Sequence, residues 1–423
     1  MHALMRRLFP ICRSITGEGV RETLRIIREH VPLEIREVPS GTKVLDWNVP
    51  HEWNIRDAWI KNAAGERIVD FKKLNLHVVS YSIPIKRRMR FAELKEHLFT
   101  IADHPDWVPY RTSYYKESWG FCLSENQLGQ FNESDEYDVC IDSSLQDGSL
   151  TYGEYLLKGA GTEELLISCH VCHPSLANDN LSGISLAVEL AKSMAEAPRR
   201  YSYRFLFIPG TIGSITWLAR NEAVVPQIRH GLVLTCVGDA GHVTYKRSRR
   251  GDAEVDRAFA HILQHSGAPH RIIDFFPYGY DERQYCSPGF NLPVGVMMRS
   301  PHGEFPQYHT SADNLEFVRP EALEDSFTKL RGVIDVLEQN RVYLNLQPKG
   351  EPQLGRRGLY GMVGGENKKD WEMAMLWVLN LSDGNSNLLD IAERSGLPFS
   401  VIYSAADALV RCELLKEIAI EHR

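Results

Sequence analysis

Short apolar runs alternate with helical patterns between about residues 152 and 339, and this alternation restricts the possible folds more than any other feature of the chain. The runs LLIS, YRFLFIP, GLVLTCVG and LPVGVMM have the length and composition of buried strands. Between them lie segments with helical apolar spacing, such as Gly183 to Met194, a helix from Ile215, Ala253 to His265, and Pro320 to Gln339. Strands that alternate with helices in this way predict an α/β fold, with a mostly parallel mixed sheet covered by helices on both faces.

The other segments predict further domains. The chain has 423 residues, of which 43% are hydrophobic, so we expect a large core divided between two or three domains. Residues 41–142 show irregular, aromatic-rich strand patterns and predict an inserted β-rich subdomain, which divides the main domain into residues 1–40 and 143–345. A stretch with Gly and Pro at 346–369 predicts a linker, and residues 370–423 have the helix-turn-helix spacing typical of a winged helix.

Charge and hydropathy exclude several partners. The net charge of -7 gives no general attraction to nucleic acid or to an anionic membrane. From Asp370 onward nine acidic residues oppose four basic ones, which favours protein contact or homo-oligomer formation over DNA binding. The N-terminus lacks the apolar core of a signal peptide, and no apolar run reaches the ~18 residues that cross a bilayer. We therefore expect a cytoplasmic protein without membrane contact.

The segment EELLISCHVCHPSLANDNLSG, residues 163–183, predicts a metal site. It places His170 at the end of a predicted strand and Asp179 in a turn before a helix, and these ligand types suit zinc. A strand-end histidine with a capping Asx turn also occurs without a metal, so this segment alone leaves both interpretations open. Cys172 lies between two histidines and is either a further ligand or a buried, inert thiol.

Later segments add polar groups near the ends of predicted strands. Asp239 follows the strand at 232–237 and can complete a metal shell, and His309 in EFPQYHTSAD is a strong ligand candidate. The segment YGYDERQY at 278–285 is dense in groups able to hold a peptide-like substrate. Aromatic residues at 110–121 either line a substrate cleft or pack in the core of the β-rich subdomain. The candidate substrate-binding residues are Asp281, Arg283, Tyr285 and Tyr308.

Three motifs, HVCHPSLANDNLSG, DERQYCSPGFNLPVG and QYHTSADN, together resemble the zinc aminopeptidases of the M28 type. More closely, the chain is similar to a bacterial family of aminopeptidase-like proteins with DUF4910 and DUF2172 domains and a C-terminal winged helix. The resemblance covers essentially all 423 residues. It implies that His170, Asp179 and Asp239 form one metal shell, with Asp179 able to bridge and His309 a ligand to the same or a second ion.

Departures from the M28 pattern affect the predicted chemistry. Cys172 replaces the aspartate that orients the first histidine, and Gly210 replaces the glutamate that acts as general base. Thr211 replaces a carboxylate ligand, so we expect one zinc ion rather than two. The base could come from Glu282 or Glu304, the chemistry could be altered, or the protein could bind without cleaving.

These observations predict a zinc-dependent hydrolase that cleaves an amide bond in a small peptide or a modified amino compound. One alternative is a non-catalytic binding protein that keeps the metal pocket but has lost its base. The other is a scaffolding or regulatory protein that acts through the C-terminal winged helix.

Overall fold

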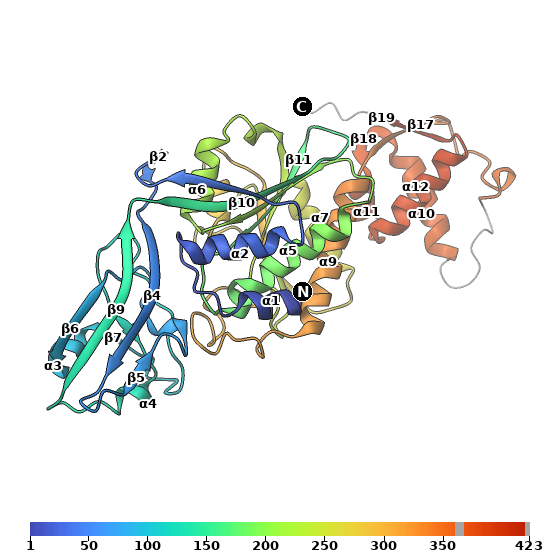
Figure 1. The fold of residues 1–423 in the computed structure, drawn as a ribbon. Helices are drawn as coiled ribbons and strands as arrows, with labels where there is room; N and C mark the ends of the chain where they lie inside the picture. The colour runs from blue at the N-terminus through green and yellow to red at the C-terminus, as the bar shows by residue number, and fades with distance from the viewer. Residues whose placement is uncertain (360–367, 419–423) are drawn as a thin grey trace. The chain divides into compact units, whose positions relative to one another are not determined.

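The computed structural model describes residues 1–359 and 368–418, in two compact units (Figure 1). The first unit comprises residues 1–253 and 271–327, and the second comprises residues 254–270 and 328–423. Within the described residues, no helix is both long enough and apolar enough to span a bilayer.

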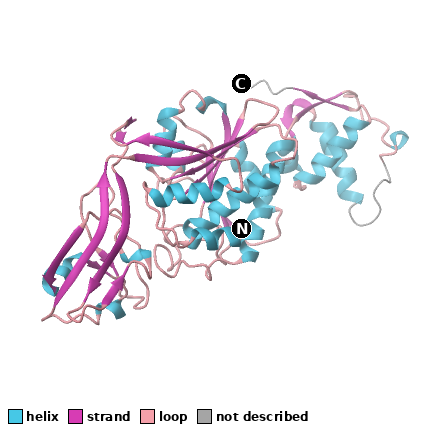
Figure 2. Cartoon of the chain, viewed as in Figure 1, coloured by secondary structure: helices cyan, strands magenta, loops and turns pink. Residues whose placement is uncertain are grey.

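An eight-stranded mixed sheet forms the centre of the first unit (Figure 2). The four middle strands pair in parallel, whereas antiparallel strands extend the sheet on both sides. The predicted α/β fold with a large mixed sheet is therefore confirmed. In spatial order the strands are β1 (Glu34–Pro39), β10 (Ser149–Leu157), β12 (Ser202–Ile208), β11 (Glu164–His170), β13 (Ile228–Leu234), β16 (Val294–Met298), β14 (Val243–Lys246) and β15 (His270–Ile273).

The two central strands β11 and β12 are buried along their whole length, which explains their continuous apolar runs. Helix α5 (Gly183–Met194) connects β11 to β12, and α6 (Ile212–Arg220) lies between β12 and β13 in the chain. Because these two crossovers run in opposite directions along the sheet, right-handed connections place α5 and α6 on opposite faces. Two helices precede β1 in the chain: α1 (His2–Leu8), which is only two turns long, and α2 (Glu18–Arg28).

Residues between β1 and β10 form a separate β-rich region of the first unit. Its sheet has the order β5-β4-β9-β6, with all neighbours antiparallel. Two short pairs, β2 with β3 and β7 with β8, complete its strands. The bounds are β2 (Lys43–Val44), β3 (Trp47–Asn48), β4 (Glu52–Lys61), β5 (Arg67–Asp70), β6 (Ile85–Arg90), α3 (Phe91–Leu94), β7 (Leu98–Phe99), β8 (Phe121–Cys122), α4 (Glu125–Leu128) and β9 (Glu136–Gln146).

The second unit contains a three-stranded antiparallel sheet and a cluster of helices. The sheet has the order β18-β17-β19, and β17 (Val342–Asn345) is its central strand. The predicted boundary had placed residues 342–345 in the peptidase domain, but their strand pairing puts them in the C-terminal sheet. Of the predicted linker, residues 360–367 lie outside the described residues. Helix α9 (Pro320–Gln339) begins in the first unit and enters the second at residue 328. The remaining elements of the second unit are α7 (Glu254–Gln264), α10 (Lys368–Leu381), β18 (Asp383–Asn387), α11 (Leu388–Ser395), α12 (Phe399–Arg411) and β19 (Leu415–Ile418).

Candidate metal centre

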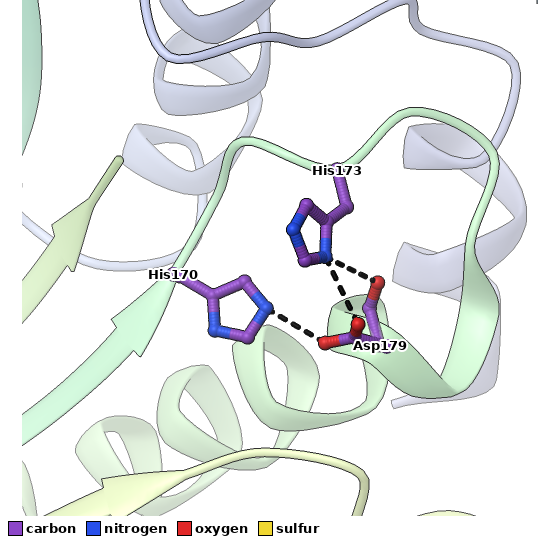
Figure 3. A group of neighbouring side chains, drawn as sticks. All are labelled: His170, His173 and Asp179. Atoms are coloured by element: carbon purple, nitrogen blue, oxygen red, sulfur yellow. Dashed lines mark hydrogen bonds and ion pairs between the residues drawn. The ribbon is translucent and has the colours of Figure 1, made fainter. Parts of the chain in front are cut away.

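His170 is the last residue of β11, at the carboxyl end of the parallel strands where α/β proteins place their sites. Its side chain is fully buried, and its Nε2 lies 2.8 Å from Oδ1 of Asp179 (Figure 3). The strand therefore fixes one imidazole directly against the carboxylate that the sequence paired with it.

Asp179 lies in an irregular turn, Ala177–Ser182, that precedes α5. Its backbone has φ -108 and ψ 78, outside the helical region, so the side chain is presented before the regular helix begins. The Asp313 carboxylate holds this turn by accepting the backbone N–H groups of Asn178 at 2.6 Å and Asp179 at 2.9 Å. The Asn180 side chain ties the same turn to the end of β13 through the carbonyl of Leu234, at 3.0 Å.

Two further histidines reach the same carboxylate. His173 Nδ1 lies 3.1 Å from Oδ2 of Asp179, and His309 Nε2 lies 3.1 Å from the same oxygen. The Tyr110 ring, from the β-rich region, packs edge-on against both histidines, with ring centroids 5.2 Å apart in each case. Three imidazoles thus surround one fully buried carboxylate. His170 and His173 come from the segment just before Asp179, and His309 comes from a distant loop.

Burial and charge together determine the protonation of this group. Burial lowers the pKa of His170 to about 4, so its imidazole is neutral and keeps a lone pair for a cation. At His173 burial opposes the charge, but the Asp179 carboxylate outweighs it and raises the pKa well above its ordinary value. The pKa of Asp179 is correspondingly held well below its usual range, against the effect of burial, by His173 and His170. A cation would therefore displace a proton from His173 when it binds.

The side chains present fit a divalent cation of the zinc type. One ligand atom each from His170, His173 and Asp179 lie within 4.8 Å of one another. Two imidazole nitrogens and a carboxylate oxygen are a common zinc donor set in hydrolases, and a fourth position is then open to water or substrate. The sequence analysis had not selected His173, although its HVCH spacing places it three residues after His170 in the turn that follows the strand.

Asp239, a predicted ligand, lies outside this group. Its carboxylate accepts hydrogen bonds from the Asn178 side chain at 2.9 Å and from the backbone N–H of Gly241 at 2.7 Å. The backbone N–H and the hydroxyl of Ser300 also donate to it, at 3.2 and 2.7 Å. With four donors around it, Asp239 fixes the loops that surround the site, and it is not among the ligand groups that cluster with Asp179. Cys236, three residues earlier, takes the place near Asp179 that the resemblance implied for Asp239.

Tyr280 occupies the space where the expected general base would lie. A Cβ atom added to Gly210 would lie 1.9 Å from Cε1 of the Tyr280 ring, so no side chain fits at 210 while the ring is there. The Tyr280 hydroxyl lies 3.1 Å from the carbonyl oxygen of Gly210, 3.3 Å from Sγ of Cys172 and 3.4 Å from Nε2 of His173. Gly210 and Tyr280 therefore form one structural feature, which a motif comparison at position 210 alone could not identify.

The two glutamates proposed as substitute bases are engaged elsewhere. Glu282 is buried and pairs with Nζ of Lys246 at 2.8 Å, and it also accepts the backbone N–H of Tyr280 at 2.9 Å. Glu304 is half-exposed and pairs with Arg271 at 2.6 Å. Neither carboxylate is among the groups that contact Asp179, so the structure favours neither as the base.

The four predicted substrate-binding residues have different surroundings. Asp281 is fully buried and accepts the Ser214 hydroxyl at 2.9 Å, and Tyr285 is fully buried with its hydroxyl 3.0 Å from that of Ser168. The Arg283 guanidinium donates to the carbonyl groups of residues 277 and 279. Tyr308 stacks on His309 with ring centroids 3.9 Å apart. Tyr308 is therefore the member of this set that contacts the histidine group directly, whereas Asp281 and Tyr285 are core residues.

Comparisons with known proteins show the family and the fold of the chain. A family model described as "Domain of unknown function (DUF4910)" matches residues 2–340, and a winged helix-turn-helix model matches residues 341–417. A protein of Clostridium acetobutylicum is 56% identical over 417 residues, 98% of this chain and 96% of that protein. Its name is "Putative polysaccharide biosynthesis protein with aminopeptidase-like domain".

Solved structures agree as well. A crystal structure of a "putative peptidase" from Clostridium acetobutylicum has a TM-score of 0.94 and 55% identity, and the match covers 99% of this chain and 96% of that one. The zinc aminopeptidase BSAP from Bacillus subtilis has a TM-score of 0.56 at 14% identity, over 79% of this chain and 93% of that one. A peptidase M28 precursor from Shewanella amazonensis has a TM-score of 0.53 at 13% identity, over 80% and 92% of the two chains.

The structures of BSAP and of the peptidase M28 precursor show the fold that this chain shares with them. The family model covers most of the chain, and the winged-helix model covers the C-terminal part. This chain belongs to the DUF4910 family, with an aminopeptidase-like α/β fold followed by a C-terminal winged helix.

Proposed function

We propose that this protein is a zinc-dependent hydrolase that cleaves an amide bond in a small peptide or a modified amino compound. The observation that carries the proposal is the convergence of His170, His173 and His309 on the buried carboxylate of Asp179. Such a group is costly to bury and is typical of a cation site in a hydrolase. The aminopeptidase-like fold and the name of the Clostridium relative support the same reaction class.

His170, His173 and Asp179 would hold the ion. When bound, zinc would supply Lewis acidity that polarises the substrate carbonyl and lowers the pKa of water. Asp313 and Asn180 keep the Asp179 turn in position, and Tyr110 packs against two of the three imidazoles. These contacts fix the orientation of the ligands before a cation arrives.

Tyr280 would contribute a hydrogen bond at the position where a glutamate at 210 would supply a base. Burial raises the pKa of the Tyr280 hydroxyl well above its ordinary value, so this group stays protonated and acts as a hydrogen-bond donor. A neutral phenol can donate to an oxygen that gains negative charge during amide cleavage, but it is a poor proton acceptor. We therefore expect slower turnover than a carboxylate base would give, since a positioned base typically contributes about 10² to 10⁴ in rate.

A second candidate function has a specific observation in its favour. Tyr280 fills the place of the base, and neither Glu282 nor Glu304 replaces it, which is also what a binding protein without catalysis would show. A screen of aminoacyl and N-acyl amides with the zinc-loaded protein distinguishes the two. Hydrolysis that His170→Ala abolishes and the surface control His51→Ala retains supports the enzyme. Bound zinc without hydrolysis of any compound supports the binding protein.

We also propose that the winged helix serves protein contact, including self-association, and not DNA binding. In DNA-binding relatives of this motif the second helix places its N-terminal residues in the major groove. Here the backbone N–H at the start of that helix, at Phe399, donates to Nε2 of His261 at 2.9 Å. Asp390 and Glu393 of the preceding helix pair with Arg257. Within the described part of the helix Phe399–Arg411 the one basic residue, Arg411, is paired with Asp407.

A further inference from the structure

A second group of possible ligands lies beside the histidine group. One ligand atom each from Asp179, Cys236 and His302 lie within 4.8 Å of one another. We infer that Cys236 and His302, together with Asp179, bind a second cation through a cysteine thiolate. This inference rests on the proposed function in one respect, because both groups share Asp179.

The backbone of Cys236 is held in an unusual conformation. It lies two residues after the end of β13, with φ +50, in the left-handed region that favours glycine. Its carbonyl is fixed by the backbone N–H of Arg299 at 2.8 Å. A non-glycine residue keeps this conformation only when its surroundings impose it, and such residues cluster at functional sites. His309, whose Nε2 lies 3.1 Å from Oδ2 of Asp179, is likewise in the left-handed region, with φ +56.

His302 reaches the group from the loop after β16. Its Nε2 lies 3.5 Å from the hydroxyl oxygen of Thr235, and the same hydroxyl lies 3.5 Å from Sγ of Cys236. Tyr308 packs edge-on against His302 with ring centroids 5.8 Å apart, and it stacks on His309 on its other side. The loop after β16 therefore carries both His302 and His309, and the Tyr308 ring contacts both imidazoles near Asp179.

The charge around Cys236 favours a cation. The thiol is fully buried, and its electrostatic neighbours are the carboxylates of Asp179, Asp313 and Asp239. Three buried acidic side chains near one thiol make a region where a metal ion is electrostatically favoured. The residues of the first group, His170, His173 and Asp179, are separate from Cys236 and His302 except for the shared carboxylate.

The donor set determines which metals would fit. Thiolate, imidazole and carboxylate ligands suit zinc, cobalt(II) and iron(II), whereas magnesium, calcium and manganese prefer oxygen ligands alone. A carboxylate with two oxygens can bridge two such ions, and Asp179 contacts His170 through one oxygen and His173 and His309 through the other. We therefore expect two ions per chain, in place of the single ion predicted from Thr211, and the second ion would have one sulfur ligand.

Cobalt(II) loading of the full chain tests this site, because a thiolate–cobalt bond gives a near-ultraviolet charge-transfer band that nitrogen and oxygen ligands do not give. The unmodified protein should bind two cobalt ions and show the band. Cys236→Ser should lose the band and one ion, whereas Cys122→Ser, a buried thiol in the β-rich region, should keep both. Cys236→Asp replaces sulfur by an oxygen ligand and should lose the band but keep two ions.

The outcomes separate this inference from the proposed function. One bound ion without the band, unchanged in Cys236→Ser, overturns the thiolate site but leaves the histidine site standing. A band that depends on Cys236 and His302 but survives His173→Ala supports the thiolate site and contradicts the histidine site. No bound cobalt in a folded, unmodified protein overturns both.

Discussion

Asp179 has no exposed surface, yet its carboxylate contacts three imidazoles and its backbone N–H is held by Asp313. A buried charge is tolerated only when it is paired and hydrogen-bonded, so the surrounding residues have to be arranged to accept it. Asp179 belongs to both groups of possible metal ligands, so the other ligand candidates are the side chains that lie close to its carboxylate.

The close contact between Gly210 and the Tyr280 ring predicts that a side chain at position 210 destabilises the protein. Gly210→Ala should lower the free energy of unfolding by about 1–3 kcal/mol, because the added Cβ would lie 1.9 Å from the Tyr280 ring. In a Tyr280→Ala background, judged against Tyr280→Ala alone, Gly210→Ala should cost much less. Gly289→Ala, where a Cβ meets open space, is the matched control. A loss at Gly210 that persists without the Tyr280 ring would mean that the ring is not the obstacle. Denaturant unfolding of the unmodified protein, Gly210→Ala, Tyr280→Ala, the double variant and Gly289→Ala measures the effect.

The buried carboxyl group of Asp281 should make the stability of the protein depend on pH. Burial raises the pKa of its carboxyl from 3.8 to about 7, so between these values the folded chain holds a proton that the unfolded chain has released. This group therefore lowers stability progressively as the pH rises from about 4 to 7. Asp281→Asn removes the titration and should stabilise the protein at pH 8 by roughly 1–3 kcal/mol, with little change near pH 4. Thermal unfolding at both pH values checks this; an equal effect at both would contradict the pKa.

At the residue scale the sequence could predict His170, Asp179 and His309, since each stands in a short motif at a strand end or in a turn. It could not predict the positions of Cys236 and Tyr280, because these depend on which loops meet in space. Asp239 illustrates the limit. It follows a strand as a ligand would, but its carboxylate accepts hydrogen bonds from four donors of the surrounding loops.

At the scale of elements, the turn Ala177–Ser182 depends on a carboxylate from a distant loop. Asp313 accepts two backbone N–H groups of this turn, and burial raises the pKa of Asp313 to about 7. Asp313→Asn puts an N–H group where one of these donors points, so the turn should shift. We expect the affinity for zinc to fall by about 10- to 100-fold, as is typical when a group that supports a ligand is changed.

Competition with a zinc chelator measures that affinity. Asp335→Asn, in α9 and half-buried, serves as the matched control and should leave the affinity unchanged. An unchanged affinity in Asp313→Asn, in a folded protein, would show that the turn does not need this carboxylate.

Periodicity predicted the long elements well because their burial is regular. The segments 183–194 and 320–339 are helices with the predicted bounds. In α11 the capping side chain of Asn387 and the left-handed Gly396 mark both ends. Periodicity could not predict β17, whose four residues are fixed by pairing with two strands that come much later in the chain.

At the scale of the whole molecule, the charge of the C-terminal unit predicts whether the protein binds DNA. For the C-terminal unit we expect no shift of any DNA duplex by the full protein in a mobility assay at low salt, where non-specific binding is strongest. The excess of acidic residues and the His261 contact at the start of α12 are the reasons. A salt-sensitive shift would contradict this and favour a regulatory role on DNA.

Metal content tests the central claim most directly. Elemental analysis of the full chain, purified without added metal and again after zinc is offered, should find zinc bound, with less in His170→Ala and in His309→Ala. The surface variant His51→Ala should match the unmodified protein. A folded, unmodified protein that takes up no zinc even when it is offered would contradict the account, because the histidines around Asp179 would then be a packing feature and not a metal centre.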